Sequence, residues 1–221
     1  MRPLAIAHRS GNSLAGLQVA NELGVDVIEC DVRRGREQLE VRHLKSAGPL
    51  PFLWDRWELT HASAARLGLH EILAAQQHGT TFMLDVKGRR GDMAAAVAEC
   101  LRRGPRREVL VCGRYWPAVD ALAELQFVRP VLSARNRAEL ARLRRRLASS
   151  RGSTRAPYGV SVHRSLLTPA LVAELHRSVE VVMTWPVNDL ASLDAVLAVG
   201  VSGVISDEAA VLAELIRRRD A

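Results

Sequence analysis

Apolar and polar positions follow a repeating order along this chain: a short β-branched run, then a longer segment with apolar residues at helical spacing. The short runs predict strands, which cover residues 4–8, 25–32, 81–87, 108–112, 128–133, 158–163, 179–185 and 202–206. The longer segments predict helices, which cover residues 13–23, 70–78, 93–103, 117–125, 137–147, 169–177, 190–199 and 208–218. A further extended piece, residues 39–43, follows the second strand and need not belong to the same sheet.

Strands that are each followed by a helix indicate an α/β protein, and eight such units predict a (β/α)8 TIM barrel. An open, doubly wound sheet is the alternative, but the count of eight and the short connections favour the barrel. We expect residues 1–221 to form a single domain. Residues 45–60 are the one long irregular stretch, and we expect them to lie over the C-terminal mouth as a short cap or lid.

The chain has a formal net charge of +7, and 29 of its 31 basic residues are arginines. Few aromatic residues interleave with the basic clusters, so we expect no nucleic acid as a partner. The charge fits an anionic small molecule or peripheral contact with anionic lipid, and the sequence leaves the oligomeric state open. Three cysteines without metal-ligand spacing indicate reduced thiols and a cytoplasmic protein, and no apolar run is long enough to span a membrane.

Charged residues gather where the second and third predicted strands end. Side chains two positions apart on a strand share a face, so Glu29 and Asp31 project together, as do Asp85 and Lys87. If these strands are neighbours, three carboxylates converge beside one ammonium group. Three carboxylates this close do not all stay ionised without a cation, and their hard oxygen atoms suit Mg²⁺ or Ca²⁺.

Other polar groups close further strands at the same edge. His8 and Arg9 end the first strand, and His43 ends the extended piece after the second. Trp185 ends the seventh strand and is followed by Pro186, Val187 and Asn188. Any one of these residues alone would more often be structural than functional. Their joint placement at the end of a barrel where active sites form predicts a catalytic site.

The ordered set of these motifs resembles the glycerophosphodiester phosphodiesterase family. The opening block of that family is similar to AHRSGNSLAGLQVANELGVDVIECDVRRGREQLEVRHL, its helix and third strand to HEILAAQQHGTTFMLDVKG, and its closing block to VVMTWPVNDLASLDAVLAVGVSGVISD. The resemblance spans nearly the whole chain and keeps the motifs in order. It implies hydrolysis of glycerophosphodiesters to glycerol 3-phosphate and an alcohol by a phosphoric diester hydrolase.

The resemblance also implies a role for each site residue. Glu29, Asp31 and Asp85 would hold the divalent metal, Mg²⁺ or Ca²⁺. His8 and His43 would be the acid–base pair. Arg9 and Lys87 would bind the phosphate, and Trp185 would shape the substrate pocket.

The chain departs from the family pattern at four places. Ser10 replaces a glycine, and Gly11-Asn12-Ser13 replaces E-N-T, so that the acidic member is missing. Leu44 replaces the aspartate that usually follows the second histidine, so His43 lacks that orienting neighbour. Asp85 replaces glutamate, as in the related sphingomyelinase D and phospholipase D branch.

The residues suit phosphodiester cleavage, since a metal, Arg9 and Lys87 would neutralise the substrate while His8 and His43 move protons. The nucleophile is water or a neighbouring hydroxyl of the substrate, and either histidine can be the base. Two other functions stay open. One is the same chemistry on lysophospholipids, with Trp54 and Trp57 touching lipid. The other is a non-catalytic barrel that binds anionic ligands or nucleic acid.

Overall fold

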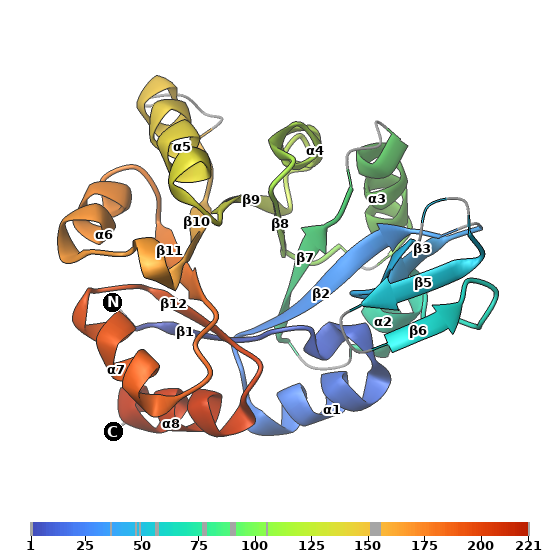
Figure 1. Ribbon diagram of the computed structural model, residues 1–221, viewed down its shortest axis with the longest axis horizontal. Helices are drawn as coiled ribbons and strands as arrows, with labels where there is room; N and C mark the ends of the chain where they lie inside the picture. Colours follow the sequence, from blue (N-terminus) through green and yellow to red (C-terminus); the bar gives the residue numbers. More distant parts are fainter. Residues whose placement is uncertain are drawn as a thin grey trace.

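The computed structural model of the chain describes residues 2–35, 37–46, 48, 50–55, 58–76, 79–88, 92–104, 106–150 and 156–220. At its centre, parallel strands form a barrel with helices around the outside (Figure 1). The barrel strands are β1 (Leu4–Ala7), β2 (Val27–Arg34), β7 (Thr81–Val86), β8 (Val109–Gly113), β9 (Val128–Ala134), β10 (Gly159–His163), β11 (Val181–Trp185) and β12 (Gly203–Ser206). Across the described ranges these are the eight strands that the sequence predicts, with ends that differ by at most a few residues.

The barrel closes between its first and last strands. Strand β1 pairs with β12 on one side and with β2 on the other, where Ile6 lies opposite Val27 and Ala7 opposite Ile28. An open sheet has two edge strands, whereas each of these eight strands pairs with a neighbour on both sides. The doubly wound alternative is therefore excluded and the (β/α)8 TIM barrel is confirmed.

Helices follow the barrel strands, and several begin at a polar cap that the sequence supplies. The helices of the described residues are α1 (Leu14–Leu23), α2 (Leu69–Ala75), α3 (Asp92–Arg103), α4 (Trp116–Leu122), α5 (Arg137–Ser149), α6 (Pro169–His176), α7 (Leu190–Ala198) and α8 (Ala209–Asp220). Ser13 caps α1 by accepting a 3.0 Å hydrogen bond from the amide of Gly16, and Thr168 does the same for α6. The predicted helix over 70–78 matches α2, and its last two residues lie outside the described ranges. None of the described helices is long and apolar enough to cross a membrane.

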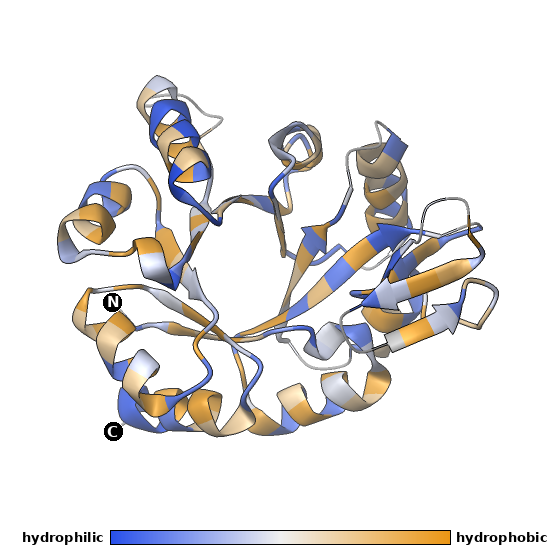
Figure 2. Cartoon of the chain, in the orientation of Figure 1, coloured by the Kyte–Doolittle hydropathy of each residue, from blue (hydrophilic) through white to orange (hydrophobic). Residues whose placement is uncertain are grey.

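Side-chain alternation divides the core into two layers. Outward positions of the strands pack under the helices, and Cys30 belongs to this outer layer. Inward positions fill the barrel with a smaller cluster that includes Ile6, Val27, Met83 and Met183. Figure 2 shows this alternation of hydrophobic and hydrophilic residues along β2. Glu29 and Asp31 lie two and four residues after Val27, so their side chains also point into the barrel. The inward face of β2 therefore becomes polar toward the C-terminal end of the strand.

Two segments after β2 form strands that are not part of the closed ring. Strand β3 (Leu39–Val41) pairs antiparallel with β2 and so extends the same sheet outside the closed ring. The stretch predicted to be irregular, residues 45–60, instead forms most of a small antiparallel sheet of β4 (Lys45–Ser46), β5 (Phe52–Asp55) and β6 (Glu58–His61). The prolines suggested irregular chain, but Pro51 precedes β5, where its carbonyl accepts a 2.8 Å hydrogen bond from Ala62. Trp57 lies outside the described residues.

Candidate active site

Three carboxylates meet at the C-terminal end of β2 and β7. Asp31 lies directly opposite Asp85 in the parallel pairing of these strands, and Glu29 lies one inward position earlier. One oxygen atom of each carboxylate lies within 4.8 Å of the others. Lys87 follows β7, and its Nζ atom is 2.7 Å from Asp31 Oδ1 and also forms an ion pair with Asp85. Strand alternation predicted this convergence on the condition that the two strands are neighbours, and β2 and β7 do pair.

The cluster carries an electrostatic conflict that one lysine does not resolve. Burial, together with the neighbouring charges of Asp31 and Asp85, raises the pKa of Glu29 to about 7. Burial acts in the same direction on Asp31, but the ion pair with Lys87 and a hydrogen bond from Asn12 bring the pKa of Asp31 below its usual value. Although burial opposes it, the pKa of Lys87 is raised because Asp85, Asp31 and Glu29 surround its ammonium group.

His8 stands at the end of β1 between two acidic groups. Its Nδ1 atom is 2.7 Å from Asp207 Oδ1, and its Nε2 atom is 4.0 Å from Glu29 Oε2. Asn188 fixes Asp207 from behind by donating a 3.1 Å hydrogen bond to Oδ2 and accepting one from the Asp207 amide. The hydrogen bond with His8 lowers the pKa of Asp207 to about 2. Burial disfavours the charged form of His8, yet Asp207 and Glu29 leave the pKa of His8 raised.

His43 has an acidic partner that the sequence analysis did not predict. Its Nδ1 atom contacts the carboxylate of Asp55 on β5, twelve residues further along the chain. Leu44, which occupies the place of the usual aspartate, is buried instead. The backbone amide of Arg42 donates a 2.9 Å hydrogen bond to the carbonyl of Asp31, which holds this part of the chain beside the carboxylate cluster. Both histidines therefore have Nδ1 bound to a carboxylate.

Arg9 adopts an unusual backbone conformation in the turn after β1. Its φ of 56° is in the left-handed region, and this orientation directs its amide to Glu29 Oε2 at 2.6 Å. Its Nε atom lies 3.6 Å from Asp31 Oδ2. The turn then rests on β2 at Gly11, where a Cβ atom would lie 2.8 Å from the Cβ of Cys30. Asn12 completes the contact with a 2.8 Å hydrogen bond from the Asp31 amide.

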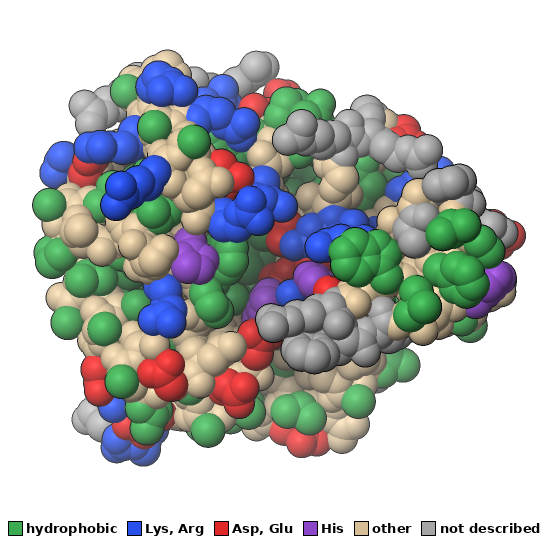
Figure 3. Space-filling model, in the orientation of Figure 1, with side chains coloured by type: hydrophobic (Ala, Val, Ile, Leu, Met, Phe, Trp, Pro, Cys, Tyr) green, Lys and Arg blue, Asp and Glu red, His purple; other side chains and the backbone are tan. Residues whose placement is uncertain are grey.

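Trp185 ends β11 at the same edge of the barrel. Its ring contacts the ring of His163 edge to face, with a centroid distance of 5.0 Å. Burial and the nearby Arg164 and Arg135 lower the pKa of His163. Figure 3 shows acidic, basic and histidine side chains gathered in the hollow at the centre of this face.

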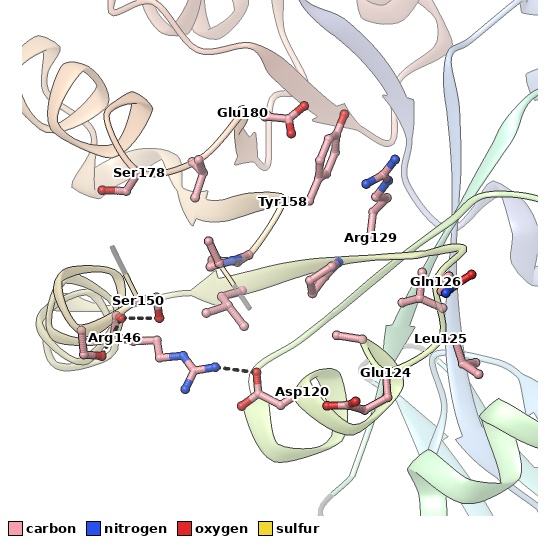
Figure 4. A pocket seen from close by; sticks show the side chains of 18 of the residues that line it. Asp120, Glu124, Leu125, Gln126, Arg129, Arg146, Ser150, Tyr158, Ser178 and Glu180 are labelled. Carbon is pink, nitrogen blue, oxygen red and sulfur yellow. Dashed lines mark hydrogen bonds and ion pairs between the residues drawn. The ribbon is translucent and has the colours of Figure 1, made fainter. Parts of the chain in front are cut away.

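A second hollow, of about 960 Å³, lies at the opposite end of the barrel around the starts of β9, β10 and β11. Figure 4 shows Tyr158, Glu180 and Arg129 above the pair that Arg146 makes with Asp120. Arg129 Nε is 2.8 Å from Glu108 Oε2, so this cation is also paired. None of the eight predicted site residues lines this hollow, and TIM barrels carry their chemistry at the other end.

The fold of this chain resembles that of several solved structures. No family model and no curated protein matches the chain by sequence. Among solved structures, a phosphodiesterase from Oleispira antarctica in complex with sn-glycerol-3-phosphate is 18% identical with a TM-score of 0.75, covering 99% of this chain and 97% of its own. A glycerophosphodiester phosphodiesterase from Thermotoga maritima is 16% identical with a TM-score of 0.73, and the match covers 97% of this chain and 98% of its own. A glycerophosphodiester phosphodiesterase from Parabacteroides distasonis is 16% identical with a TM-score of 0.73, and the match covers 100% of this chain and 99% of its own.

The chain has the fold of the glycerophosphodiester phosphodiesterases. The motifs that resemble this family lie at the ends of β1, β2, β7 and β11 of one barrel, and His43 follows β3 outside the closed ring. Against the family pattern, the chain keeps the asparagine of E-N-T as Asn12, bonded to Asp31, and the cap position as Ser13. Asp55 contacts His43, although the neighbouring position of the chain holds Leu44.

The donor set fits a divalent metal ion of the hard class. Glu29, Asp31 and Asp85 offer oxygen atoms only, which Mg²⁺ and Ca²⁺ both accept. Lys87 offsets one of the three charges, and the raised pKa of Glu29 shows that charge repulsion and burial are not fully compensated by the protein alone. A cation held between these oxygen atoms would relieve that repulsion.

Proposed function

We propose that this protein is a phosphoric diester hydrolase that uses a divalent metal ion and two histidines to split glycerophosphodiesters into glycerol 3-phosphate and an alcohol. The observation that carries the proposal is the pair of histidines, each bound through Nδ1 to its own carboxylate, beside a three-carboxylate cluster. The product bound in the Oleispira antarctica phosphodiesterase is consistent with this substrate class.

In this proposal the chain supplies charge and protons at the mouth of the barrel. Glu29, Asp31 and Asp85 would hold Mg²⁺ or Ca²⁺, which neutralises phosphate charge when bound. Lys87 and Arg9 bind the phosphate oxygens and stabilise the charge that builds in the transition state.

The histidines carry the proton transfers. The side chains of His8 and His43 are both partly exposed, so substrate can approach both rings. One takes a proton from the attacking oxygen and the other gives one to the departing alkoxide, while Asp207 and Asp55 hold the two rings in orientation. Trp185 forms part of the pocket wall beside His163.

We propose that the chain acts as one domain, with residues 45–60 as a cap that contributes Asp55 to the site. Cys30, Cys100 and Cys112 are free thiols, which fits a reducing cytoplasm.

A substrate panel tests the proposal. Glycerophosphocholine and related diesters are incubated with the protein in Mg²⁺, in Ca²⁺ and in EDTA, and glycerol 3-phosphate is measured. We expect release with at least one metal and none in EDTA, and His43→Ala serves as the inactive reference. Full hydrolysis in EDTA, or none under any condition, contradicts the proposal.

Lysophospholipids are a second candidate substrate class. The observation that favours them is the position of Phe52 and Trp54, which are exposed on the strand that also carries Asp55. Lysophosphatidylcholine in the same panel decides between the two classes, because preference for it would appear as release of choline or lysophosphatidic acid.

A further inference from the structure

The small sheet of β4, β5 and β6 has one face toward the barrel and one toward solvent. Leu53 is buried, and Asp55, on the same side of β5, reaches His43. The alternate positions form the opposite face. There Lys45 and Leu59 lie opposite Trp54 from either side, in the register of the three strands.

The solvent face is strongly apolar. Among the described residues, seven large hydrophobic side chains are exposed. Three of them, Phe52 (38%), Trp54 (44%) and Leu59 (70%), lie on this face, and a fourth, Leu50 (60%), lies in the connection between β4 and β5. Single exposed hydrophobic residues are ordinary, but a cluster on one small element indicates a surface that another body covers. Figure 3 shows hydrophobic side chains, in green, gathered over the region of β5 and β6 beside the central hollow.

The charge on this face determines what would cover it. Lys45 Nζ lies 5.2 Å from the centre of the Trp54 ring, and the ring of His61 meets that of Phe52 edge to face at 5.6 Å. The one described carboxylate of β5, Asp55, is on the other face. Aromatic rings and a lysine around an apolar centre match the boundary between lipid headgroups and acyl chains, and the positive charge selects anionic headgroups.

We propose that the solvent face of this sheet docks on an anionic membrane surface, so that the mouth of the barrel opens next to the lipid. The proposal rests on the proposed function, since it places the site where lipid-derived phosphodiesters are released. The excess of 31 basic over 24 acidic residues adds a general attraction to such a surface. A second copy of the chain would carry the same positive charge to this face, which disfavours self-association there.

Vesicle co-sedimentation of the full chain, without substrate, tests the docking. We expect binding to vesicles of phosphatidylcholine with phosphatidylglycerol, weaker binding at high salt, and little binding to phosphatidylcholine alone. The double variant Trp54→Ser/Leu59→Ser should bind at least about tenfold more weakly. Its matched control is Leu14→Ser/Val19→Ser on α1, where the side chains are 53% and 54% exposed, and this control should bind like the wild type. Lys45→Glu should weaken binding to the anionic vesicles alone.

Each other outcome has a definite meaning. Equal losses in the two double variants, or no binding of the wild type to anionic vesicles, overturn the docking proposal. A wild-type dimer that the Trp54→Ser/Leu59→Ser change dissociates also overturns it, because a second copy would then cover the face. Vesicle binding without any hydrolysis would instead refute the proposed function alone, and hydrolysis of glycerophosphocholine without vesicle binding would refute the docking alone. Circular dichroism of each variant confirms that the barrel is folded.

Discussion

Replacing Glu29 by glutamine should stabilise the metal-free protein. The Glu29 side chain is buried, and its Oε2 atom accepts the 2.6 Å hydrogen bond from the Arg9 amide. The oxygen of a glutamine side chain can accept the same bond, so Glu29→Gln removes a charge while keeping the shape and the contact. What it loses is the repulsion from Asp31 and Asp85.

The size of the effect follows from the pKa of Glu29. Burial and neighbouring carboxylates raise this pKa from an ordinary value of 4.5 to about 7. At about 1.4 kcal/mol for each pH unit, ionised Glu29 costs the folded state up to about 3 kcal/mol. Below pH 4.5 the carboxyl is protonated in both states and costs nothing. Between pH 4.5 and 7 the unfolded chain binds fewer protons than the folded one, so this contribution lowers stability as pH rises.

The assay is unfolding of the EDTA-treated protein at a series of pH values. At pH 8 we expect Glu29→Gln to exceed the wild type by up to about 3 kcal/mol, which for a chain of this size raises Tm by about 6–12 °C. The difference should shrink toward pH 4.5. Glu22→Gln, on the exposed side of α1, is the control and should change little at any pH. Adding Mg²⁺ or Ca²⁺ should then raise the Tm of the wild type more than that of Glu29→Gln.

The reasoning is refuted if Glu29→Gln is no more stable than the wild type at pH 8. That result would mean that Lys87 and Arg9 already compensate the three carboxylates, so the cluster would have no need of a further cation. An equal response of both proteins to metal would place the cation elsewhere.

Three further predictions concern catalysis. His8→Ala and His43→Ala should each lower kcat by about 10²-fold or more, the scale of a positioned acid or base, whereas His176→Ala on α6 should leave kcat near the wild-type value. Asp55→Asn should lower kcat more than KM and shift the pH–rate profile, because it removes the charge that orients His43; an unchanged profile would make Asp55 purely structural. Lys87→Arg should lose most activity while its Tm stays near that of the wild type, because a planar guanidinium does not fit between the carboxylates as an ammonium does, and near wild-type kinetics would assign Lys87 to the scaffold.

The barrel could be predicted because its information is local and repeated. Each strand of the ring is a short apolar run, and each helix has apolar spacing and, in several cases, a polar cap such as Ser13 or Thr168. Residues 45–60 were predicted wrongly as irregular. A strand with one exposed face is expected to alternate apolar and polar residues, but in this small sheet the exposed positions are also apolar. Phe52 and Trp54 there obscured the period-two pattern.

The candidate site was predictable only where its geometry follows from a strand. Alternation placed Glu29, Asp31 and Asp85 together, since neighbouring parallel strands bring such positions into one row. Asp55 could not be found in this way, because its contact with His43 depends on how a separate small sheet folds back. Asp207 had a signal that could have been used: it directly follows the last strand, at the edge where the other polar groups lie.

The closure of the barrel between β1 and β12 bears on the order in which the proposed site is assembled during synthesis. His8 is synthesised well before its partner Asp207, which follows it by 199 residues, and before Asn188, which supports Asp207. Contacts so distant in sequence form late, after the local strand–helix units have been made. A nascent chain that has folded all but its last strand would thus hold the three carboxylates and His43 in place and still lack an oriented His8. Catalytic competence would then arrive in a single step, when β12 enters the ring.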